Sequence, residues 1–259
     1  MFGFIEKLGV GDALRRIYTG EDALQKHMWL FLLVAVPAML TTPLNQASKH
    51  LVLTNAQFCL ALLGLLVIAV MSIYIGGYLY GVMNKSFEEN GESILPTFDR
   101  SWFKVFFKGF PVQLTWFCYL TVIFVITAII VALLGGWLLP YSVRAISKLS
   151  LFVAFLVINV FIISLPLVYS RFAENYDRTG LYNPILPLKY MCKAFKSFIT
   201  LLLVFAPAFV VIAIIGYLGT KDNVFAYLLT ASWAYLWTIM QYSANYCFVQ
   251  IYKKELRAE

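Results

Sequence analysis

The chain has 259 residues, of which 61% are hydrophobic and 13% are charged, and its formal net charge is +7. Soluble domains carry about 45–50% apolar and about 25% charged residues, so this composition excludes an ordinary soluble fold and indicates a protein surrounded by lipid. In such a protein a basic excess is typical of orientation signals and of contacts with anionic lipid, and it does not indicate nucleic-acid binding.

Uncharged segments recur along the chain, and a transmembrane helix needs about 17–25 mostly apolar residues. The segments that meet or approach this length are 28–44, 51–82, 112–140, 149–170, 198–219 and 224–252. The sequence therefore predicts an all-α integral membrane protein, a single domain over residues 1–259 with six transmembrane helices.

Lysine and arginine are distributed unequally between the connections. Sixteen of the 20 lie before the first segment, after the last, or in the connections after the second and fourth, and four lie in the remaining connections. Because cytoplasmic loops carry the excess of lysine and arginine, this asymmetry predicts a multi-pass protein of the cell (inner) membrane with both termini in the cytoplasm.

Two of the basic connections also have the pattern of helices that lie on a membrane surface. Apolar residues recur at helical spacing in both, and the cations fall on another face. The cations are Arg100, Lys104 and Lys108 in residues 97–110, and Lys189, Lys193 and Lys196 near the start of the fifth segment. These six residues are candidate contacts with anionic lipid or with a partner, and structural anchoring is the other interpretation.

The sixth segment carries small and polar residues at spacings of four, four, three and four: Thr230, Ala234, Thr238, Gln241 and Asn245. Amides avoid acyl chains, so this stripe is predicted to face other helices, with Trp233 and Trp237 pointing elsewhere. It is interpreted either as packing between helices or as part of a small cavity lined by Asn159, Thr238, Gln241 and Asn245. In the second segment, small residues at helix-contact spacing predict a close approach to another helix: Ala69, Ser72, Gly76, Gly77 and Gly81. The third segment has the same pattern at Ala128, Ala132 and Gly135.

An internal repeat is also visible. Tyr80, Gly91 and the run 94–96 (Ile-Leu-Pro) recur as Tyr169, Gly180 and the run 185–187, with eleven residues from tyrosine to glycine in both places. The pattern predicts three parallel units, near 11–87, 94–175 and 183–256, each with an amphipathic segment and two spans, related by rotation about the membrane normal.

Enzyme motifs are missing from the sequence: it contains no phosphate-binding loop, dinucleotide fingerprint, HExxH or nucleophile elbow. No catalytic residue, cofactor or metal ligand is therefore predicted, and we do not expect an enzyme. The six segments hold no acidic or basic residue, which disfavours an ion-coupled carrier. The function predicted is a membrane module that binds lipid or a partner protein, and the alternative is a passive transporter or channel for a small or apolar solute.

Two blocks carry a resemblance to a known family. They are the residues 11–14 (Gly-Asp-Ala-Leu) with 18–22 (Tyr-Thr-Gly-Glu-Asp), and the stretch from Gly76 through Asn84, Gly91 and residues 95–98 to Gly109. The chain resembles the uncharacterised polytopic membrane protein family catalogued as domain of unknown function four-zero-one-three. The resemblance implies a multi-pass membrane protein and brings no catalytic residues with it.

Overall fold

A computed structural model describes residues 9–20, 22–47, 55–88, 93–95, 102–138, 152–153, 164–221 and 225–257. These residues form helices and short turns, with no strand among them. The elements are α2 (Val10–Tyr18), α3 (Ala23–Ala47), α4 (Asn55–Lys85), α5 (Trp102–Leu138), α7 (Arg178–Leu181), α8 (Ile185–Lys193), α9 (Phe195–Gly219), α10 (Ala226–Ile251) and the π-helical η1 (Tyr252–Leu256). A further helical stretch covers residues 164–175.

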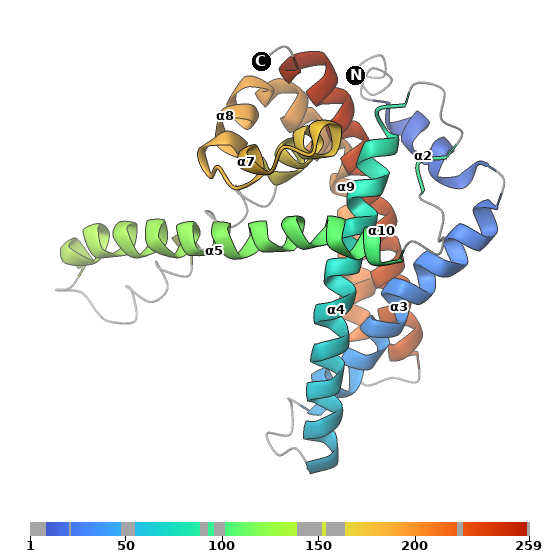
Figure 1. The fold of residues 1–259 in the computed structure, drawn as a ribbon. Helices are drawn as coiled ribbons and strands as arrows, with labels where there is room; N and C mark the ends of the chain where they lie inside the picture. The colour runs from blue at the N-terminus through green and yellow to red at the C-terminus, as the bar shows by residue number, and fades with distance from the viewer. Residues whose placement is uncertain are drawn as a thin grey trace.

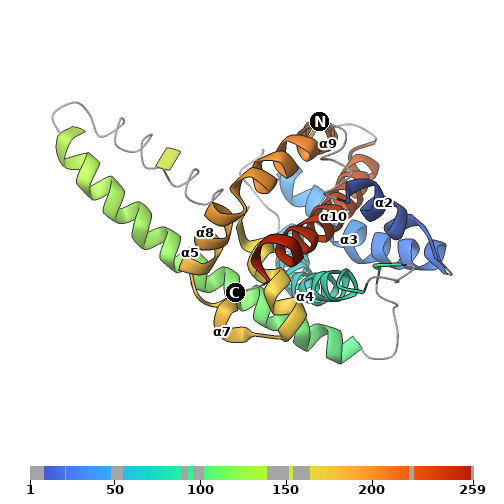
Figure 2. The ribbon, with the colours of Figure 1, turned by 90° about the horizontal axis from the view of Figure 1, so that it is seen from above.

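Helix α10 is the central element of the bundle. It packs against α3 and α4 on one side and against α9 on the other, and α2 lies across its last turns (Figures 1 and 2). The short elements α2, α7, α8 and η1 gather at one end of the molecule, where α4 and α10 also end (Figure 1). The two ends of the described chain therefore lie on the same side of the bundle.

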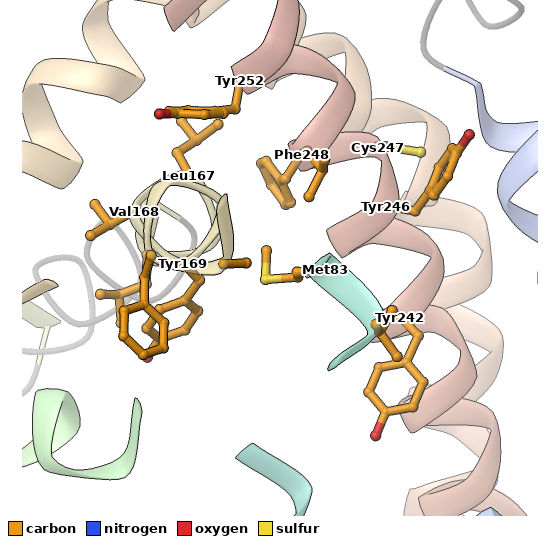
Figure 3. Packing of buried hydrophobic residues seen from close by; sticks show 14 of the residues in the cluster. Met83, Leu167, Val168, Tyr169, Tyr242, Tyr246, Cys247, Phe248 and Tyr252 are labelled. Carbon is orange, nitrogen blue, oxygen red and sulfur yellow. The ribbon is translucent and has the colours of Figure 1, made fainter. Parts of the chain in front are cut away.

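The buried core is concentrated near that end and is rich in aromatic residues. Met83 of α4, Phe248 of α10 and Tyr252 of η1 point toward the helical stretch that carries Leu167 and Tyr169 (Figure 3). The largest fully buried side chains include Tyr78, Tyr119, Tyr242 and Phe172. Because an aromatic side chain buries about 150–250 Å², each of these contributes a large apolar contact area to the core.

Glycines bring α4 and α5 into close contact. A Cβ atom added to Gly109 would lie 1.8 Å from the Ile73 carbonyl oxygen and 2.4 Å from the Gly77 nitrogen, so only glycine fits there. The Gln113 amide of α5 also donates a 2.7 Å hydrogen bond to the Ser72 carbonyl. The close contact predicted from the small residues of the second segment is thus confirmed at Ser72, Gly76 and Gly77, and its partner is the first third of α5.

Helix α5 differs from its prediction. The sequence predicts a surface helix over 97–110 and a separate span from 112, whereas α5 is one helix from Trp102 to Leu138 with Pro111 inside it. A proline inside a helix loses one backbone hydrogen bond and costs about 3 kcal/mol or more. Here Gly109, Pro111 and Val112 are all buried beside α4, and this packing offsets the cost. Beyond the crossing, α5 leaves the bundle (Figures 1 and 2).

Within the described residues, two helices are long and apolar enough to cross a membrane, Phe107–Ile130 within α5 and Phe195–Gly219, which is α9. The other predicted segments coincide with helices in part: α3 begins before residue 28, α4 begins at Asn55, and α10 matches 224–252 closely. The first and third predicted units share an element order, a nine-residue helix followed by two long ones: α2, α3 and α4, then α8, α9 and α10.

Candidate functional site

The end of α4 is covered by donors from three other segments. Arg16 Nη2 lies 3.1 Å from the Glu88 carbonyl, Gln250 Nε2 lies 3.4 Å from the Ser86 carbonyl, and Lys253 Nζ lies 3.4 Å from the Phe87 carbonyl. These carbonyls belong to the turn that follows α4, which ends at Lys85. Two cations and an amide therefore join this turn to α2, α10 and η1.

Arg16 is buried, with 5% of its surface exposed, because it also contacts α10. Its guanidinium carbon lies 5.5 Å from the centre of the Tyr246 ring, and its Nη1 lies 3.4 Å from the Tyr246 hydroxyl. That hydroxyl in turn donates to the Asp12 carboxylate. Arg16 therefore acts as a structural link between α2, the turn after α4 and α10.

The second set of predicted cations lies around the junction of α8 and α9. Lys189, Lys193 and Lys196, called here the lysine collar, are all exposed, and the two helices meet at Ala194. Leu186 and Tyr190 of α8 are buried in the protein. Exposed apolar side chains stand beside the cations, with Ile185 71% and Phe195 56% exposed. The surface therefore combines positive charge with apolar groups, as helices at a lipid headgroup layer do.

From the lysine collar an apolar surface continues along α9. We call this the outer face of α9, and its exposed members are Ile199, Leu203, Val210, Val211, Ile214, Tyr217 and Leu218. At the far end of the helix, the Lys221 ammonium lies 4.4 Å from the centre of the Tyr217 ring. Helix α9 thus has a long apolar surface with cations at both ends and a tyrosine at one of them.

The first set of predicted cations is only partly described. Arg100 lies outside the described residues, while Lys104 and Lys108 are exposed in the first turns of α5. The Lys108 ammonium lies 5.0 Å from the centre of the Tyr80 ring on α4, a cation–π contact. These lysines therefore stand beside the α4–α5 crossing and not on a separate surface helix.

The polar stripe predicted for the sixth segment is divided in the structure. Thr238 and Asn245 are buried, and they donate to the carbonyls of Ala234 and Gln241 at 2.8 and 2.7 Å. The Gln241 side chain is exposed, and Asn159 lies outside the described residues. The two tryptophans of α10 pack toward α9, because Trp233 contacts Gly216 and the Trp237 ring lies 4.9 Å from that of Phe209. The expectation that the tryptophans point away from other helices is wrong.

A lateral pocket of about 350 Å³ lies between α3 and α10. It is lined by Leu24, His27, Met28, Phe31, Leu32 and Tyr235. The five α3 residues follow helical spacing, so one face of α3 forms most of the wall. Ligand pockets are typically about 300–1,000 Å³ and mainly apolar, and this pocket falls at the lower end of that range.

The polar groups of the lateral pocket are bonded to one another. His27 Nε2 lies 3.1 Å from the Ile17 carbonyl and its Nδ1 lies 2.8 Å from the Tyr235 hydroxyl, while Tyr18 stacks on the ring with centroids 4.8 Å apart. Since the carbonyl only accepts, Nε2 carries a proton, and in the neutral ring Nδ1 then accepts from the Tyr235 hydroxyl.

Sequence reasoning missed Arg16, His27 and Tyr235, because their partners are distant in the chain. For two of them, the helical spacing of neighbouring apolar residues could have indicated burial. Arg16 falls on the same side of α2 as Ala13 and Ile17, both buried, and His27 shares the apolar face of Leu24, Met28 and Phe31.

Comparisons with known proteins find no match: no family model, no curated protein and no solved structure is significantly similar to this chain. What the structure itself establishes is a helical architecture in the described residues, with two helices long and apolar enough to cross a membrane.

Proposed function

We propose that the chain is a multi-pass membrane protein that binds anionic lipid at one face of the membrane, through the lysine collar, without catalysing a reaction. The observation that carries the proposal is the continuity of the collar with the outer face of α9. At 1.5 Å per residue, the 25 residues of α9 extend about 38 Å, enough for a hydrocarbon layer of about 30 Å. The collar then falls at the headgroup layer, where lysines meet lipid phosphates.

The proposal includes the six-span topology with both termini in the cytoplasm. It is supported by the position of α2 and η1 at the same end of the bundle and by the basic side chains of α2, α8 and η1 there. The shared element order of the first and third units supports the predicted repeat. Membership of the family that the sequence resembles is part of the same proposal, and a passive transporter or channel is its alternative.

The test is the lipid that copurifies with the protein in mild detergent, measured by mass spectrometry. Each cation near an anionic membrane surface contributes about 1 kcal/mol. Replacing all three lysines of the collar with glutamine should therefore lower the ratio of retained phosphatidylglycerol to phosphatidylethanolamine by about tenfold or more. Replacing them with arginine keeps the charge and should keep the ratio. An unchanged ratio in the glutamine variant would refute anionic-lipid binding at the collar.

A further inference from the structure

The lateral pocket between α3 and α10 presents an apolar wall with no charged side chain among its lining residues. Its two polar members, His27 and Tyr235, are bonded to each other, and the other ring nitrogen of His27 is bonded to Ile17. A ligand therefore meets hydrocarbon and aromatic surfaces, and the groups that would recognise a polar head are already engaged.

The lateral pocket has a volume of about 350 Å³ and is open toward the side of the bundle. A thin and flexible hydrocarbon chain is the ligand that fits this volume and this lining.

Three of the residues that line the lateral pocket are also exposed on the surface of α3. Leu24, Met28 and Leu32 are 77%, 58% and 47% exposed and follow one another at four-residue spacing along α3. This apolar strip leads from the bundle surface to Tyr235, so a chain can lie along α3 and reach the pocket from the side.

We propose that the lateral pocket binds the hydrocarbon chain of a membrane lipid and does so without regard to the lipid's headgroup. The proposal rests on the proposed function, since it needs the protein to be surrounded by lipid. It assigns a site different from the lysine collar: the collar selects headgroups by charge, and the pocket selects chains by shape.

The experiment uses the full chain in vesicles that contain a phospholipid with a photoreactive diazirine in its acyl chain. The probe is made with either a phosphatidylcholine or a phosphatidylglycerol head, and labelled peptides are mapped by mass spectrometry. We expect residues 24–32 and Tyr235 to be labelled several-fold more than the outer face of α9, equally for both heads. Met28→Trp or Leu32→Trp fills the pocket and should reduce this labelling to the level of α9, whereas Leu203→Trp on the outer face of α9 should not.

Each result has a distinct meaning. Labelling of the pocket no stronger than that of α9 would overturn the inference while leaving lipid contact in place. Strong preference for one headgroup would overturn headgroup independence. Absence of labelling on both α3 and α9 would overturn the proposed function itself.

Discussion

Among the described glycines, Gly109 has the least space for a side chain. Its missing Cβ leaves room for the backbone of Ile73 and Gly77, and backbone atoms cannot rotate away as a side chain can. Overpacking of this kind costs about 1–3 kcal/mol or more. We expect Gly109→Ala to lower the thermal unfolding temperature in detergent by several degrees. Gly11→Ala is the matched control, because nothing lies within 4 Å of its added Cβ and alanine favours a helix by about 1 kcal/mol. If Gly109→Ala unfolds at the wild-type temperature, α4 and α5 do not pack together through this glycine.

Asp177 is the N-cap of α7, and its carboxylate makes the stability of this short helix depend on pH. Its carboxylate accepts hydrogen bonds from the Thr179 hydroxyl and from the Thr179 and Gly180 amides, and it pairs with Arg171 at 3.0 Å. The hydrogen bond from the Thr179 side chain is the largest of the effects that hold the pKa of Asp177 below its ordinary value. A lowered carboxyl pKa stabilises the folded state above the ordinary pKa of about 3.9, and this contribution is lost as pH falls through the lowered value.

We therefore expect the amides of Thr179 and Gly180 to exchange with solvent faster at pH 3 than at pH 6, after correction for intrinsic exchange rates. Asp177→Ala removes the cap of α7, at a cost of about 1 kcal/mol, and should make exchange fast at both pH values. Asp177→Asn keeps an acceptor without a titrating group, so its protection should no longer change between pH 3 and pH 6. A pH response that persists in the asparagine variant would assign it to another group.

Among the elements, α9 is the one on which a substitution can distinguish a membrane span from an apolar helix exposed to water. Val210 is 58% exposed near the middle of its outer face. A lysine at the centre of a span costs about 2.5–3.5 kcal/mol in insertion, whereas an exposed substitution in water changes stability by about 0.5 kcal/mol or less. We expect Val210→Lys to reduce the fraction of protein that resists alkaline extraction from membranes. Ile199→Lys, on the same face beside the lysine collar, should have a much smaller effect. Equal behaviour of the two variants would argue against a span.

The bounds of a helix were predictable where the length of an apolar run determines them. They were less predictable where a contact with a distant part of the chain determines them. The position of α9 follows from its uncharged run, and its observed start at Phe195 lies three residues before the predicted one. The continuity of α5 through Pro111 depends on Gly109 meeting α4, which no local pattern reveals. In α10 the buried face is centred nearer Tyr242 than Gln241, because the neighbouring helices, and not the heptad spacing, decide which side is covered.

The same distinction applies to the candidate sites. The lysine collar was predictable, since charge and helical spacing are local properties of the sequence. The lateral pocket was not, because His27 is joined to Tyr235 across 208 residues. Only folding brings the two side chains together, and the sequence around each one shows nothing that distinguishes it from other helical residues.

For the whole molecule, the decisive prediction is the side of the membrane on which each connection lies. The sixteen-to-four division of lysine and arginine predicts cytoplasmic termini, because basic loops are retained on the cytoplasmic side.

Exposed Cys118 and Cys192 would react with a thiol reagent, so a cysteine-free background is needed. In that background, single cysteines at Ser48, Ser147 and Lys221 should react with a membrane-impermeant maleimide added to intact cells. A cysteine at Ser93 should react only after the membrane is opened. Because the three outer positions come from three different connections, protection of any one would remove a pair of spans from the topology. Protection of all three, with Ser93 reactive from outside, would invert the orientation and place the lysine collar on the opposite face.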